Sequence, residues 1–174
     1  MTGSGTLAMP TVEQVRATLD RVVDPEIPVL TIEDLGILRD IRVSDDGEVE
    51  VVITPTYSGC PAMQQIESDV EAALAEDGYD RVRVTTVLSP AWTTDWMTEE
   101  GRRRLAEYGI APPAGSAPRG PVQVSLSMRP PMPDVHCPRC GGLGRESSRF
   151  GSTSCKAAYI CTQCAEPFDY FKPI

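Results

Sequence analysis

The sequence is poor in histidine, in basic residues and in long apolar runs, and each shortage excludes a class of protein. Its 174 residues include one histidine, His136, which excludes His₂ and His₃ metal sites and the HExxH zinc-protease motif within the chain. Sixteen Lys and Arg residues stand against twenty-five Asp and Glu residues, and the net charge of −9 argues against nucleic-acid binding as the main function. The chain also lacks a phosphate-binding glycine loop and a dinucleotide fingerprint, so we do not expect an independent enzyme.

Signals for export and for membrane insertion are missing as well. The first ten residues, MTGSGTLAMP, have neither the basic segment nor the apolar core of a signal peptide. No run reaches the roughly 18 apolar residues that cross a bilayer. We therefore expect a cytoplasmic protein with no membrane partner. In that reducing compartment, paired cysteines are more often metal ligands than disulfides.

Four of the six cysteines form two CxxC pairs, Cys137 with Cys140 and Cys161 with Cys164. Each pair lets two thiolates approach one ion from a tight turn, and the separation of the pairs is within the range of a zinc ribbon. A closed shell of four cysteines leaves no position for a catalytic water, so the pattern predicts structural zinc. Iron in the same tetrahedron is the alternative, because ligand geometry alone does not separate the two metals.

Two residues near these pairs have simpler interpretations. His136 precedes the first ligand and is expected to face solvent, since four cysteines already complete the shell. Cys155 lies between the two pairs and is expected to be a small buried apolar residue, with a second-metal or thiol role as the alternative.

Charge and composition divide the chain into two parts. Residues 1–111 carry 21 acidic and 9 basic side chains, a net charge of −12, whereas residues 112–174 carry 4 and 7, a net charge of +3. Between them the segment 111–133 begins with a run rich in Pro, Gly and Ala, which is typical of a linker. We expect a first domain at 9–110 and a Cys₄ ribbon at 134–174. A segment as short as the second needs a metal to fold.

The first domain is predicted to be a small α+β sandwich with its helices on one face of a sheet. The element order is α-β-β-α-β-α. A capping box at Thr11 and Gln14 begins the first helix, and Asp45, Asp46 and Gly47 form the turn of a hairpin. The remaining periodicities place strands at 37–43, 48–54 and 81–88 and helices from Pro61 to about Gly78 and from about Thr98 to Tyr108.

Cys60 is the only cysteine of the first domain. If a helix begins at Pro61, Cys60 is its N-cap, where free backbone N–H groups and the helix dipole favour a thiolate. The alternative is a cysteine that simply caps the helix, and the local sequence does not decide between them. Asp24 and Glu26 flank a proline after the first helix; ending that helix is their simplest role, and pairing with arginine or a functional site are the alternatives.

Four segments carry a family resemblance: 24–38 (DPEIPVLTIEDLGIL), 54–61 (TPTYSGCP), 89–97 (SPAWTTDWM) and 151–171 (GSTSCKAAYICTQCAEPFDYF). Together they resemble the PaaD family, also called PaaJ, of the bacterial phenylacetyl-CoA epoxidase system, over roughly residues 10–174. The first domain resembles the wider SufT-like iron–sulfur assembly domain, whose marks are a DPE motif, a DLG motif and a cysteine after a Thr-rich strand end.

The resemblance implies an accessory protein of aerobic phenylacetate degradation that helps to assemble or maintain the metal centres of the epoxidase complex, without catalysis of its own. It assigns Cys60, with Asp24, Glu26 and Thr56, to the handling of iron or a transient iron–sulfur cluster. The oxygenase and reductase subunits are the implied partners, and two chains could share a cluster between two Cys60 side chains. The alternatives are a structural subunit that docks components of the complex, a nucleic-acid-binding ribbon and a thiol oxidoreductase; the acidic first domain and the paired CxxC motifs oppose the last two.

Overall fold

The computed structural model describes residues 9–57, 59–115 and 134–174, and it divides into two compact units. The first unit comprises residues up to Glu33 together with Ile37–Pro90. The second comprises Asp34–Gly36 and Ala91–Ile174. Within the described residues, no helix is both long and apolar enough to cross a membrane. The domain limits expected from the sequence, 9–110, 111–133 and 134–174, stay a prediction, and most of the expected linker lies outside the described residues.

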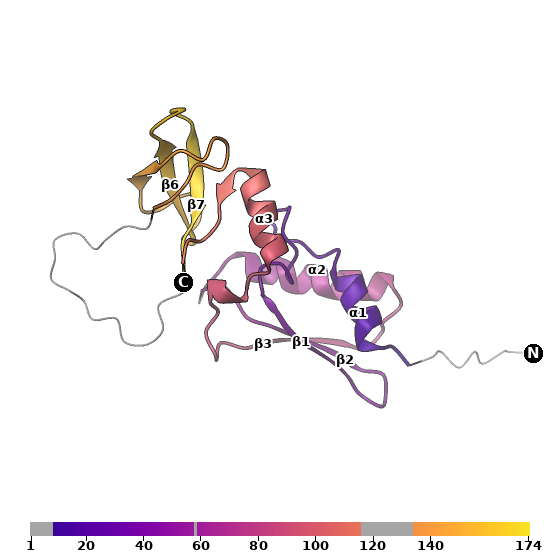
Figure 1. Ribbon diagram of the computed structural model, residues 1–174. Helices are drawn as coiled ribbons and strands as arrows, with labels where there is room; N and C mark the ends of the chain where they lie inside the picture. Colours follow the sequence, from indigo (N-terminus) through magenta and orange to yellow (C-terminus); the bar gives the residue numbers. More distant parts are fainter. Residues whose placement is uncertain (1–8, 58, 116–133) are drawn as a thin grey trace, which may run out of the picture. The chain divides into compact units, whose positions relative to one another are not determined.

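The first unit is a three-stranded sheet with two helices on one face (Figure 1). Strands β1 (Leu38–Val43) and β2 (Val49–Ile53) form an antiparallel hairpin, and β3 (Val82–Thr86) lies parallel to β2. Helix α2 (Ala62–Glu76) makes the crossover between the two parallel strands, as such a connection requires. Helix α1 (Val12–Leu19) packs against α2 and β1.

Periodicity in the sequence explains which faces of this unit are buried. Helix α1 starts at the expected capping box, where Thr11 accepts a hydrogen bond from Gln14 N. The sheet turns one face to the helices, and its central strand contributes residues with no exposed surface: Val49, Val51 and Ile53. The opposite face carries ion pairs such as Arg42 with Glu50 and is mostly polar, with Val52 as a buried apolar residue on it. This alternation confirms the predicted α+β sandwich.

The second unit combines a helical segment with a four-stranded sheet. The short helix η1 (Thr94–Trp96) leads into α3 (Glu99–Tyr108), which is capped at its start by the Thr98 side chain and ends at Gly109 with φ 100°. The sheet order is β4-β7-β6-β5. Its strands are β4 (Ile110–Ala111), β5 (Gly144–Ser148), β6 (Lys156–Cys161) and β7 (Pro167–Phe171).

Aromatic side chains form the core of this second sheet. The rings of Tyr159 and Tyr170 meet edge to face with centroids 5.4 Å apart, and the Phe168 ring lies 5.8 Å from that of Tyr159. These rings pack with Cys137 and Cys161, so the ribbon core and the cysteine pairs are one cluster.

Candidate metal centre

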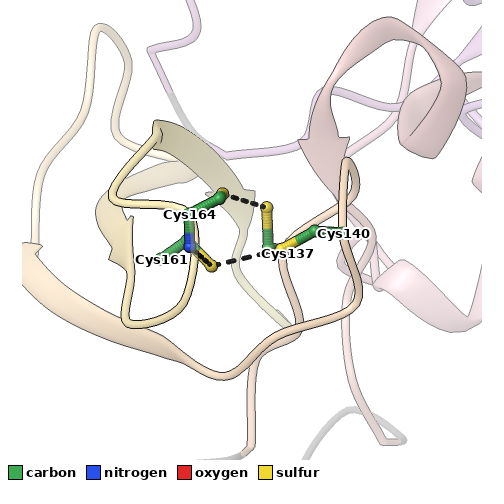
Figure 2. Close-up of side chains that lie close together, drawn as sticks. All are labelled: Cys137, Cys140, Cys161 and Cys164. Carbon is green, nitrogen blue, oxygen red and sulfur yellow. Dashed lines mark hydrogen bonds between the residues drawn. The ribbon is translucent and has the colours of Figure 1, made fainter.

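The four cysteines of the two CxxC pairs converge on one point (Figure 2). Their sulfur atoms all lie within 4.8 Å of one another. The Sγ atoms of Cys137 and Cys164 are 4.0 Å apart, and those of Cys140 and Cys161 are 3.4 Å apart. A tetrahedron with Zn–S bonds of about 2.3 Å has edges of about 3.8 Å. The donor set therefore fits a zinc ion with only small adjustments.

The two turns that carry these cysteines share one backbone conformation. Gly141 N donates to Cys137 O at 2.9 Å, and Ala165 N donates to Cys161 O at 3.1 Å. The residue that follows each second cysteine has positive φ: 75° at Gly141 and 60° at Ala165. The sequence suggests this conformation at the first turn through its glycine pair. At the second turn the residue with positive φ is an alanine, which gives no sign of this conformation in the sequence. Only its position directly after Cys164, equivalent to that of Gly141 after Cys140, could have indicated it.

Backbone N–H groups also donate hydrogen bonds to the sulfur of Cys161 and favour its thiolate form. Cys164 N and Gln163 N both approach its sulfur, at 3.5 and 3.4 Å. These donors, that of Cys164 first, lower the pKa of Cys161 to about 6. A thiolate is the form that binds zinc, so these two donors favour the ligand form of Cys161.

The two bystander residues lie where the sequence suggests. His136 is exposed, and its Nδ1 lies 2.9 Å from Gly141 O, which places the ring against the outside of the first turn. Cys155 is buried, and its sulfur lies 3.0 Å from the Thr153 hydroxyl. Neither belongs to the four-sulfur cluster.

Cys60 lies one residue farther from the helix than the sequence predicts. Helix α2 begins at Ala62 with Pro61 as its N-cap, so the expected N-cap position of Cys60 is wrong. The reason is a tight turn before the helix: Cys60 N donates to Tyr57 O, and Cys60 O accepts from Met63 N. Gly59, with φ 90°, makes this turn. The Cys60 side chain is half-buried.

Asp24 closes a turn. Its Oδ1 accepts hydrogen bonds from the N–H groups of Glu26 and Ile27, both at 2.8 Å, and the residue is 8% exposed. Helix α1 already ends at Leu19, so the interpretation that Asp24 and Glu26 stop it is wrong. Glu26 itself is exposed.

Thr56, the remaining residue of the predicted cluster-handling set, is also buried. Among the described residues, no hydrogen bond or ion pair joins any two side chains of the set Asp24, Glu26, Thr56 and Cys60.

An open cavity of about 780 Å³ lies elsewhere in the first unit. Its lining comes from α1, from the β1–β2 turn and from the connection after α2, and includes Arg21, Asp46 and Asp77. Asp77 follows the last residue of α2, and Cys60 lies two residues before the first. A helix of 15 residues is about 22 Å long, so the cavity and the thiol are at opposite ends of it.

Two family models match different parts of the chain. The family described as "Iron-sulfur cluster assembly protein" matches residues 12–88, and the family described as "PaaD zinc beta ribbon domain" matches residues 122–172. The first match includes Asp24, Glu26, Thr56 and Cys60, and the second includes all four cysteines of the metal cluster.

Relatives of the whole chain and of its first part are known. A protein of Escherichia coli (strain K12), provisionally named as one of the subunits of 1,2-phenylacetyl-CoA epoxidase, is 47% identical over 170 residues, which cover 97% of each chain. A protein of Porphyromonas gingivalis named "Fe-S protein maturation auxiliary factor" is 36% identical over 96 residues, 55% of this chain and 90% of that protein.

A solved structure supports the fold of the first part. The crystal structure of a domain of unknown function, DUF59, from Bacillus anthracis superimposes with a TM-score of 0.51 at 28% identity. It covers 53% of this chain and 89% of that one. The expected iron–sulfur assembly fold, followed by a zinc ribbon, is therefore confirmed.

Proposed function

Because the chain belongs to the PaaD family, we propose that it is an accessory protein that assists the assembly or maintenance of metal centres in a phenylacetyl-CoA epoxidase complex. The observation that supports this most is the combination of parts: an iron–sulfur assembly domain and a closed four-cysteine ribbon in one chain. Relatives of the first part are named maturation factors for iron–sulfur proteins. The protein would act on the complex without catalysing its reaction.

The chemistry of the cysteines assigns different roles to the two parts. The ribbon thiolates of Cys137, Cys140, Cys161 and Cys164 would hold a zinc ion as a closed set of four ligands, which would stabilise the fold and leave no open position for chemistry. Cys60 is outside that cluster, half-buried, and next to the start of α2. A single thiolate can bind iron and release it, because it supplies one bond of the several that a stable site needs. In a reducing cytoplasm we expect Cys60 to stay a thiol available for this cargo.

Asp24, Glu26 and Thr56 have supporting roles in this proposal. Asp24 fixes the turn through two backbone N–H groups, which leaves its Oδ1 occupied. Glu26 is exposed and offers a carboxylate to a cation. Thr56 is buried on the segment that leads to Cys60 and supplies a hydroxyl.

The oxygenase and reductase subunits of the complex are the partners we expect, with the ribbon as part of the docking surface. Two chains could also share one cluster between two Cys60 thiolates. The alternative function is a structural subunit that joins components of the complex and carries no metal to them, which the name of the E. coli relative equally allows.

Co-expression separates these functions. The oxygenase and reductase subunits are produced with wild-type chain, with Cys60→Ser, with the matched control Cys155→Ser, or alone, and their iron and acid-labile sulfide are measured after purification. We expect low iron in the subunits produced alone or with Cys60→Ser, and full iron with Cys155→Ser. Full iron in every sample refutes the proposal. Assembly that depends on the chain but not on Cys60 supports the structural alternative.

A further inference from the structure

The loop tripeptide Asp34–Gly36 belongs to the second compact unit, although the chain on both sides of it belongs to the first. Asp34 is 7% exposed, and both of its carboxylate oxygens are bonded. Oδ1 accepts from the Thr98 hydroxyl at 3.0 Å, and Oδ2 accepts from the Arg104 guanidinium at 2.8 Å. Its backbone oxygen accepts from Thr98 N at 2.9 Å.

The two residues after Asp34 are held in place as well. Leu35 O accepts from Trp92 Nε1 at 3.0 Å. Gly36 has φ 69°, and a Cβ there would lie 2.6 Å from Trp96 O, so only glycine fits. We call Asp34–Gly36 and its partners the clasp; these partners are Trp92, Trp96, Thr98 and Arg104.

The residues before and after the tripeptide make backbone hydrogen bonds to the Asp24 turn and to the segment that leads to Cys60, the two parts of the proposed cluster-handling site. On the entering side, Ile32 N donates to Val22 O and Asp24 N donates to Leu30 O, which connects the loop to the Asp24 turn. On the leaving side, Ile37 O accepts from Thr54 N at 2.9 Å. Thr54 begins the segment that runs through Thr56 to Cys60.

We infer that Asp34 and Arg104 are positioning residues for the thiol site, because the clasp fixes the loop from which the Asp24 turn and the Cys60 segment are held. This inference rests on the proposed function of Cys60. The path is short: Gly36 packs closely against Trp96, and its covalent neighbour Ile37 holds Thr54. Through it, segment 92–104 sets the conformation available at Cys60.

The charge of Asp34 is the element of the clasp to test. Asp34→Asn keeps the size of the side chain and removes the charge that Arg104 faces. Glu107→Gln is the matched control, since Glu107 is an exposed carboxylate paired with Arg103 on the same helix, α3. Both are made in a zinc-loaded Cys155→Ser chain, so that Cys60 is the reactive thiol. The readouts are the alkylation rate of Cys60, amide hydrogen exchange over 22–31 and 54–60, and zinc content.

We expect Asp34→Asn to raise the Cys60 alkylation rate and the exchange at 22–31 and 54–60 by about two- to thirtyfold, the range that coupling between linked sites produces. Zinc content and the Glu107→Gln rates should stay at their wild-type values. Adding Arg104→Met to Asp34→Asn should cause little further change, because both residues act through one interaction.

A different pattern overturns the inference. If exchange rises only over 92–104, with Cys60 alkylation and exchange at 54–60 unchanged, the clasp stabilises its own unit and nothing more. If Asp34→Asn does not fold, Trp92→Phe replaces it, because this variant keeps an aromatic ring and loses the bond to Leu35 O; unchanged Cys60 rates would then count against the inference. Neither result affects the iron assay of the co-expressed subunits, so failure of the clasp and failure of the proposed function are distinguishable.

Discussion

The backbone conformation of the two ribbon turns leads us to expect opposite effects on stability from two single substitutions, one in each turn. Ala165 and Gly141 hold equivalent positions after the second cysteine of each pair, with φ of 60° and 75°. Ala165→Gly relieves a side chain in a backbone region that favours glycine, and Gly141→Ala introduces one. Space does not complicate the second change, because a Cβ at Gly141 meets no atom within 4 Å.

Two opposing terms set the size of each effect. A Cβ in the left-handed region costs about 1–2 kcal/mol in the folded state. Glycine in place of alanine gives the unfolded chain extra freedom worth about 0.4–1 kcal/mol. Ala165→Gly should therefore stabilise the ribbon by about 0.5–1 kcal/mol, and Gly141→Ala should destabilise it by the same amount. The double variant should be close to wild type, since the residues belong to different turns.

Zinc affinity is the measurement, because folding and metal binding are linked in a small ribbon. Competition with a chromophoric chelator at fixed pH should show a Kd about two- to fivefold lower for Ala165→Gly and higher for Gly141→Ala. The wild type and the double variant serve as controls. Shifts of the same sign in both single variants would refute the reasoning, and so would no shift in either, because the φ values would then not control the turn.

Three further predictions concern other parts of the chain. Cys161→Ser should lose the zinc that Cys155→Ser retains, as measured by elemental analysis, because Cys161 is one of the four clustered cysteines and Cys155 is not. Equal zinc in both variants would contradict the ligand set. Ser44 and then Arg81 hold the pKa of Asp46 at about 2, so stability from this carboxylate is present above its ordinary pKa and is lost as pH falls towards 2. Thermal unfolding of Asp46→Asn should therefore show a smaller loss between about pH 4 and pH 2 than the wild type, and parallel curves would argue against the Asp46–Arg81 pair. Gly144→Ala should destabilise the second unit by about 1–3 kcal/mol in chemical denaturation, because a Cβ there would lie 2.6 Å from the Phe168 ring; wild-type stability would show that the ring can move.

The features that the sequence predicts well are local ones. A CxxC pair encloses its metal within four residues, so spacing alone identifies the ribbon, and the capping box at Thr11 and Gln14 fixes the start of α1 in the same way. The start of α2 is misplaced by one residue because a turn at Gly59 precedes it, and turns of this kind shift helix boundaries by a residue or two. That single residue removes Cys60 from the N-cap position.

Long-range pairing explains what the sequence could not show about the acidic residues. Asp34 finds its partners 64 and 70 positions along the chain, at Thr98 and Arg104, and no periodicity marks such a pair. An acidic residue in a motif indicates a cation ligand only if the fold leaves its oxygen atoms available. Both oxygens of Asp34 are bonded, and Oδ1 of Asp24 accepts two backbone N–H groups. Glu26 is exposed, and no described residue donates a hydrogen bond to its carboxylate. If a carboxylate assists Cys60 in holding iron, Glu26 is therefore the stronger candidate of the three.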